Sequence, residues 1–193
     1  MKTSRAQVEQ NRENLLKAAS QGFRRKGFDG VNVSEIMSDV GLTHGGFYNY
    51  FASKEDLAGQ ACEHSLASQA DKLRAVAGGD PATELTAYFE RYLTAANRDD
   101  PGDACMFPSL AAEVARQGDG VRHIFTGGVR DYLSALGDIS DRDDNDKTAP
   151  KNAIAILSTL VGAMVLARAV DDEALSDGIL SAAKEALKSR YGQ

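Results

Sequence analysis

The segment GLTHGGFYNYF, at residues 41–51, carries the side chains of this chain that are best suited to contact a nucleic acid. The amide of Asn49 can pair with the edge of an adenine. The phenol of Tyr48 and the hydroxyl of Thr43 can donate hydrogen bonds to phosphate oxygens. Gly45 has no side chain, so the backbone can approach a DNA groove closely there. Together these groups predict a surface that reads double-stranded DNA.

The surrounding pattern predicts how these groups are positioned. Apolar side chains recur at helical spacing over residues 33–40, which indicates one short helix. Gly41 interrupts that helix, and Thr43 can cap a second helix that is expected to run from His44 to Phe51. A helix, a tight turn and a second helix form a helix-turn-helix, which lays its second helix in the major groove.

The net charge of −6 does not oppose this interpretation, because the acidity lies elsewhere in the chain. Residues 1–57 carry eight Lys or Arg and seven Asp or Glu, a net charge of +1. The remaining residues carry fourteen Lys or Arg and twenty-one Asp or Glu, a net charge of −7. An acidic body repels phosphate and helps to orient the N-terminal segment toward DNA.

Residues 11–57, NRENLLKAASQGFRRKGFDGVNVSEIMSDVGLTHGGFYNYFASKEDL, resemble the N-terminal domain of the tetracycline-repressor (TetR) family of bacterial transcription factors. The segments VSEI, GLTHGGFYNYF and SKEDL carry most of the resemblance. It implies that Asn32, Ser34 and Lys54 contact phosphates. His44 also lies on the predicted DNA-contacting face, although the family often has Lys or Arg at that position.

The rest of the chain also shows helical spacing, so we expect an all-α fold. A three-helix helix-turn-helix DNA-binding domain is predicted over residues 1–52, with its first helix ending at Gly27. A helical domain is predicted over residues 53–193, starting with a long helix to about residue 77. The polar, acidic stretch at 138–150 is expected to be a mobile loop.

The resemblance implies that this second domain binds a small-molecule effector and dimerises. Aromatic side chains with neighbouring adaptable groups could line a pocket for an apolar ligand. The alternative is that each of them fills the core of a helical bundle. The candidates are Tyr88, Phe89, Tyr92, Cys105, Met106, Phe107, Phe125 and Tyr132.

The two cysteines, Cys62 and Cys105, do not form a disulfide framework and fit a reducing cytoplasm. The N-terminal segment lacks the apolar stretch of a secretion signal, which also favours the cytoplasm. Cys105 is predicted to lie in the first turn of a helix, where a thiol has a lowered pKa. Some family members sense oxidants or electrophiles through a cysteine in this region. The preferred interpretation is that both cysteines are small buried apolar groups.

The last two helices, near 151–170 and 173–190, are the best candidates for a two-fold dimer interface. Small or aliphatic side chains repeat along both of them. The predicted interface residues are Leu160, Ala163, Ala167, Leu175, Ile179, Ala183 and Leu187. The apolar segment 153–170 is long enough to cross a bilayer. Its small residues and the acidic stretch before it favour a helix buried in protein, so no membrane partner is expected.

An enzyme is not expected, since the three histidines are isolated and no catalytic or nucleotide-binding fingerprint is present. Neither a cofactor nor a metal ion is expected. The chain is identified as a homodimeric, ligand-responsive transcriptional regulator, preferably a repressor that a small molecule releases from operator DNA. The alternatives are a regulator that senses oxidants through Cys105 and a constitutive DNA-binding protein without an inducer.

Overall fold

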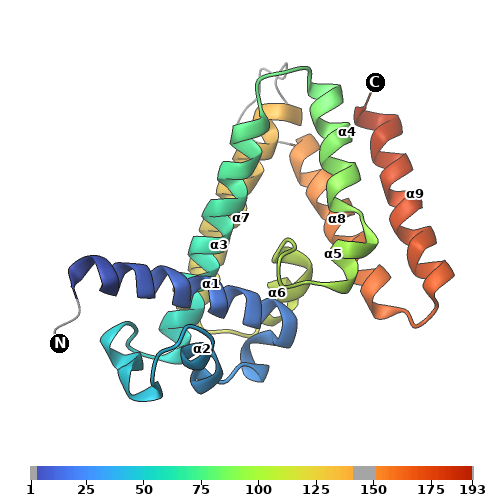
Figure 1. Ribbon diagram of the computed structural model, residues 1–193. Coiled ribbons are helices and arrows are strands. Elements are labelled where there is room, and N and C mark those ends of the chain that lie inside the picture. Colours follow the sequence, from blue (N-terminus) through green and yellow to red (C-terminus); the bar gives the residue numbers. More distant parts are fainter. Residues whose placement is uncertain (1–3, 141–150, 193) are drawn as a thin grey trace.

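The computed structural model describes residues 4–140 and 151–192, and within these ranges every regular element is a helix (Figure 1). This confirms the predicted all-α fold. The elements are, in chain order, α1 Arg5–Gly30, α2 Val33–Asp39, the 3₁₀ helix η1 His44–Asn49, α3 Lys54–Val76, α4 Pro81–Tyr92, α5 Ala95–Asp99, α6 Phe107–Val114, α7 Asp119–Ser140, α8 Lys151–Ala169 and α9 Glu173–Tyr191.

Polar side chains fix the helix starts in the N-terminal part. The side chain of Asn32 caps α2, accepting from the backbone N–H of Ser34 at 2.8 Å. At the start of α3, the Ser53 hydroxyl accepts from the backbone N–H of Asp56. The Asp56 carboxylate accepts in turn from the backbone N–H of Ala52. Capping on this scale contributes about 1 kcal/mol per site, so the short helices are held where the sequence places them.

Gly27 interrupts α1, because its backbone has φ 72° and ψ 173°. This is close to the predicted end of the first helix, although a short helical turn continues to Gly30. A Cβ at Gly27 would lie 2.5 Å from a carboxylate oxygen of Glu113 on α6. The same carboxylate accepts from the backbone N–H of Phe28 at 2.8 Å. The kink therefore brings the end of α1 against the body of the molecule.

The second helix of the helix-turn-helix differs from the prediction. It is a 3₁₀ helix that ends at Asn49, whereas an α-helix to Phe51 was expected. Gly45 and Gly46 explain the difference, since each glycine destabilises an α-helix by about 1 kcal/mol relative to alanine.

The stretch predicted as a mobile loop is only partly described. Residues 138–140 are the last residues of α7, so the helix continues into that stretch. Residues 141–150 lie outside the described residues. The predicted domain boundary between residues 52 and 53 stays a prediction.

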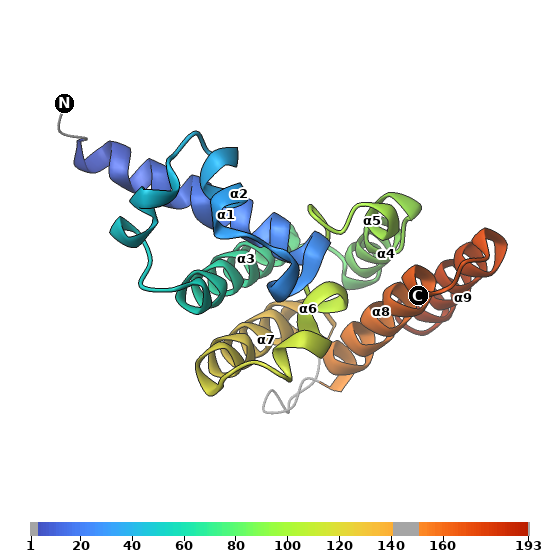
Figure 2. The same ribbon diagram turned by 90° about the horizontal axis from the view of Figure 1, so that it is seen from below.

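The body is built around two helix pairs (Figures 1 and 2). Helix α3 packs along α7, and α8 packs along α9, which also contacts α4. Helices α8 and α9 lie far from α2 and η1 in both views. Helix α8 is long and apolar enough to cross a membrane, but the core helix of a soluble protein passes the same test. It packs against α6, α7 and α9 in this chain.

Close packing of α3 on α7 depends on Gly128, where an added Cβ would lie 2.3 Å from the Leu66 Cδ1 atom. Gly128→Ala is therefore expected to lower the free energy of unfolding by about 1–2 kcal/mol, as overpacked cores do. The neighbouring Gly127 has nothing within 4 Å of an added Cβ. Gly127→Ala is expected to raise stability by up to about 1 kcal/mol, because alanine favours the helix. Urea unfolding of the two variants checks this pair, and equal effects would contradict it.

Candidate functional site

The predicted DNA-contacting residues gather on one surface of the N-terminal part, around α2, η1 and the start of α3. Seven of the eight are exposed: Asn32, Ser34, Thr43, His44, Gly45, Tyr48 and Asn49. Lys54, the first residue of α3, is half-buried. Tyr48 projects furthest into solvent, with 74% of its surface exposed. Its phenol is therefore accessible to a ligand from solvent.

Hydrogen bonds order this surface before any ligand arrives. The Ser34 hydroxyl lies 3.0 Å from Nδ1 of His44, which joins α2 to η1. The oxygen of the Asn32 side chain is already committed to capping α2. Thr43 stands at the N-cap of η1, but its side chain makes no capping bond, contrary to the prediction. Its hydroxyl therefore stays available for a phosphate.

Buried aromatic side chains on the inner side of η1 hold its exposed side in a fixed orientation. Phe47 and Phe51 are buried, with their ring centroids 5.8 Å apart. The ring of Tyr48 meets that of Phe47 edge-on at 5.3 Å. Tyr50 is half-buried, and its hydroxyl accepts from the Asn11 amide at 3.1 Å. The buried aromatic groups fix the direction in which Tyr48 and its exposed neighbours point.

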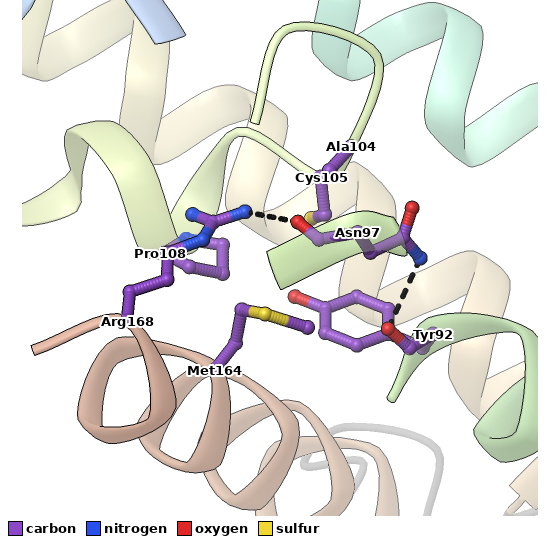
Figure 3. A pocket seen from close by; sticks show the side chains of 7 residues that line it. All are labelled: Tyr92, Asn97, Ala104, Cys105, Pro108, Met164 and Arg168. Atoms are coloured by element: carbon purple, nitrogen blue, oxygen red, sulfur yellow. Dashed lines mark hydrogen bonds between the residues drawn. The ribbon is translucent and has the colours of Figure 1, made fainter. Parts of the chain in front are cut away.

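A second site lies in the body, where α4, α5, α8 and the chain before α6 meet. Figure 3 shows the side chains that line a small cavity there. The cavity has a volume of about 10 Å³, which is room for about one water molecule. The hydroxyl end of Tyr92 points into it, toward Arg168 and Met164 (Figure 3). This hydroxyl is buried and makes no well-formed hydrogen bond, although it interacts weakly with the Cys105 thiol. Burial also raises the pKa of Tyr92 far above its ordinary value, so the phenol is neutral.

Arg168 spans this cavity from α8. Its Nε donates to the backbone carbonyl of Arg98 at 3.1 Å. Its two terminal nitrogens donate to the backbone carbonyl of Asn97 at 2.6 Å and to the hydroxyl of Ser109 at 3.0 Å. All three acceptors are neutral. Burial lowers the pKa of Arg168, while nearby Tyr92 and Cys105 raise it.

A larger cavity of about 240 Å³ borders the small one and shares four of its wall residues: Tyr92, Asn97, Ala104 and Cys105. Tyr88 and Tyr132 form part of its wall, and their hydroxyls lie 2.5 Å apart. Gln69 also lines it and holds a buried side-chain oxygen without a partner. This volume is near the lower limit of pockets that take small molecules.

The structure separates the predicted pocket residues into two groups. Tyr88, Tyr92, Cys105 and Tyr132 line these cavities. The others, Phe89, Met106, Phe107 and Phe125, do not line them and pack in or against the core. The sequence analysis missed the polar wall formed by Asn97 and Arg168. A single arginine in an otherwise apolar helix was the available signal, because its N–H groups need buried acceptors.

Cys105 does not lie in the first turn of a helix, as the sequence had suggested. Helix α6 begins at Phe107, and Cys105 belongs to the preceding loop. Burial raises the pKa of its thiol instead of lowering it. Burial also raises the pKa of Cys62 to about 12. Over residues 4–140 and 151–192, no group of three His, Cys, Asp or Glu side chains could hold a metal ion.

The loop at residues 100–105 touches both the cavities and α1. Arg24 of α1 donates from Nε to the carbonyl of Gly102 at 2.8 Å. Arg25 forms a two-bond ion pair with Asp100 at 3.1 and 3.2 Å. Gln21 donates to Asp103 at 2.6 Å. We call these three contacts the α1 latch.

Most of the predicted dimer-interface residues do not lie on the exposed side of α8 and α9. Leu160, Ala163, Ala167 and Leu187 are buried inside the chain, which makes them poor candidates for contact with a partner, and their role at an interface stays a prediction. They pack in the core, which the chain is large enough to form without a partner.

The other three predicted interface residues differ among themselves. Ile179 and Ala183 are partly buried, and Leu175 is 52% exposed. The exposed large apolar side chains of α8 and α9 are Ile154, Val165, Leu166 and Leu175, which we call the outer face.

Comparison with known proteins supports the N-terminal assignment. Residues 15–61 match the family model described as "Bacterial regulatory proteins, tetR family". The chain is 31% identical over 81 residues to the uncharacterized HTH-type transcriptional regulator YerO of Bacillus subtilis (strain 168), covering 40% of the chain and 28% of YerO. It is 27% identical over 128 residues to the HTH-type transcriptional repressor NemR of Escherichia coli (strain K12), covering 65% of the chain and 64% of NemR.

Both matches thus span less than two thirds of the relative's length. The fold is similar over a longer range. A crystal structure of the reduced form of E. coli NemR superposes with a TM-score of 0.76 and 23% identity, covering 93% of this chain and 96% of that one. At this identity the likeness concerns the fold, including the all-helical body.

Proposed function

The chain belongs to the tetR family of bacterial regulatory proteins, and we propose that it is a cytoplasmic, homodimeric repressor that a small molecule releases from operator DNA. The observation that carries the proposal is the ordered, exposed face of η1. There, Thr43, Tyr48 and Asn49 are exposed, while the buried rings of Phe47 and Phe51 hold the segment in place from below. We call α1, α2 and η1 together the DNA-binding head. In such a head, phosphate contacts set the position of the protein on the DNA, and base contacts set its sequence preference.

The roles within the head follow from chemistry and exposure. The uncommitted Thr43 hydroxyl and the projecting phenol of Tyr48 donate to phosphates. Lys54 adds a cation at the start of α3. Asn49 reads an adenine edge with its amide. Gly45 leaves the backbone open, with nothing within 4 Å of an added Cβ.

Two heads are needed for a two-fold operator, and the outer face of α8 and α9 is the surface we propose for pairing. Its large apolar side chains would stay in water in a monomer. Pairing two such faces about a two-fold axis buries each of them against its copy. Leu175 is the one residue of the original prediction that keeps this role in full.

We expect a bound ligand to release the protein from DNA by moving the loop at residues 100–105. One end of this loop lines the cavities through Ala104 and Cys105. The other end holds α1 through the α1 latch. A ligand that displaces the loop would shift α1 and the helix-turn-helix with it. The two heads would then no longer match two half-sites one helical turn apart.

A reporter gene placed behind the DNA upstream of the chain's own gene tests this proposal. Expression of the chain should lower the output of the reporter, and a small molecule that stabilises the purified chain should restore it. An increase in output on expression would indicate an activator. Repression that no stabilising compound relieves would indicate the constitutive alternative.

Sensing through Cys105 is the second candidate, because this residue is part of the loop that holds α1. Its raised pKa opposes this role, since the thiolate is the reactive form. We expect wild type and Cys105→Ser to keep DNA binding and to respond alike to peroxide and to iodoacetamide. Gel shifts with and without each reagent check this. Release of the wild type alone would establish the cysteine as the sensor.

A further inference from the structure

The polar side chains that line the small cavity of Figure 3 include hydrogen-bond donors but no negatively charged acceptor. Three of the five N–H groups of Arg168 are used, and all of their acceptors are uncharged. No carboxylate lines this cavity. Arg168 is only partly buried, and carboxylates lie nearby, since Asp99, Asp171 and Glu173 line a second pocket that Arg168 also borders. The small cavity itself offers Arg168 no negative charge.

Tyr92 adds a second group with the same requirement. Its hydroxyl is buried and points into the cavity beside Arg168, where it has a weak contact with the Cys105 thiol and no well-formed hydrogen bond. A buried polar group left without a full hydrogen bond is destabilising, so native proteins rarely keep one without a reason. The Tyr92 hydroxyl and the two unused N–H groups of Arg168 can all donate. A single acceptor placed between them, such as a carboxylate oxygen, would satisfy all of these donors.

The neighbouring cavity supplies a different surface. Its wall includes Leu73, Tyr88 and Tyr132, and it shares Tyr92 and Cys105 with the small cavity. The phenols of Tyr88 and Tyr132 are hydrogen-bonded to each other. The two rings give the wall apolar faces, but Lys72, Arg91 and Asp103 also line it, and the Arg91 guanidinium lies over the Tyr88 ring. An aromatic body can pack against such rings.

We propose that the effector is a small carboxylate with an aromatic body, whose carboxylate is held by Arg168 and Tyr92 and whose ring lies against Tyr88 and Tyr132. This inference rests on the proposed function and names the class of its effector. A molecule that reaches from one cavity to the other must move the side chain of Tyr92 or Cys105. Movement of Cys105 displaces the loop that ends in the α1 latch.

Calorimetric titration of the purified chain with benzoate and with phenylacetate tests the proposal, each against its neutral amide, benzamide or phenylacetamide. Each carboxylate should bind at least about tenfold more tightly than its amide, because charge-assisted hydrogen bonds are the stronger ones. The carboxylates should also weaken DNA binding, and the amides should not.

Tyr92→Phe is the sharpest variant, since it keeps the ring and removes only the buried hydroxyl. It should fold at least as stably as wild type and bind benzoate about three- to tenfold more weakly. Tyr191→Phe is the matched control, because Tyr191 also has a buried hydroxyl without a partner and lies at the end of α9. It should bind benzoate like wild type.

Equal binding of both carboxylates and their amides, or no binding of either carboxylate, would overturn the proposal. So would equal benzoate affinities for Tyr92→Phe and Tyr191→Phe. DNA binding is measured separately without any ligand. If it persists while the carboxylates fail, only the effector class is wrong. If it is absent, the proposed function fails whatever the calorimetry shows.

Discussion

Replacing Leu166 by Arg is expected to give a folded monomer that binds operator DNA about 10²–10⁴-fold more weakly than wild type. Leu166 is 57% exposed on the outer face, so the chain itself tolerates the change. A guanidinium buried against its two-fold copy cannot find a counter-charge there and repels the other copy. Loss of the second head then removes the gain that two linked binding events provide.

Sedimentation velocity at micromolar concentration checks the assembly, and fluorescence anisotropy checks the affinity. Val76→Arg is the matched control, since Val76 is also an exposed apolar residue but lies at the end of α3. It should sediment and bind like wild type. A Leu166→Arg variant that still sediments as a dimer would exclude the outer face as the interface. A wild-type chain that sediments as a monomer would exclude dimerisation itself.

The second large effect is expected from Gly45→Glu. An added Cβ at Gly45 meets nothing within 4 Å, so the variant should fold with an unchanged or raised melting temperature. The carboxylate would face DNA phosphates at the point of closest approach. Like charges placed together cost several kcal/mol, so operator affinity should fall by at least about a hundredfold.

Gly127→Glu carries the same change of charge on α7, at a site that is also open. It should bind DNA within about twofold of wild type, since a distant single charge is largely screened at physiological salt. Anisotropy titrations of both variants at one salt concentration make the comparison. Equal affinities would show that η1 does not face the DNA.

The head could be predicted from the sequence because its signals are local. Asn32 and Ser53 are good N-caps, and both cap helices in the structure. Gly41 marked a turn and has φ 73°. The 3₁₀ form of η1 was not predicted, although Gly45 and Gly46 weaken an α-helix. Spacing alone does not distinguish two helix types of similar period over six residues.

The exposed side of α8 could not be predicted in the same way. The helix is apolar almost all round, so periodicity does not show which side meets the core. Ala163 and Ala167 were placed at the interface because small residues let another helix approach. The neighbouring helix is in fact α9 of the same chain, and the larger Val165 and Leu166 are exposed.

The pocket shows a third limit of sequence reasoning. Aromatic content indicated a lined cavity, and Tyr88, Tyr92 and Tyr132 do line one. However, the sequence could not show that Arg168 meets the carbonyls of residues 97 and 98, seventy positions earlier in the chain. Only the fold brings these groups together. The polar chemistry of the pocket therefore emerged from the structure alone.

Binding of the purified chain to the DNA upstream of its own gene, at 50 and at 200 mM salt, tests the central claim most directly. With about six phosphate contacts per dimer, the affinity should fall on the order of a thousandfold between the two concentrations. Random DNA of equal length should bind more weakly at both. No binding to this region, equal binding to random DNA, or an affinity that salt does not change would contradict the account.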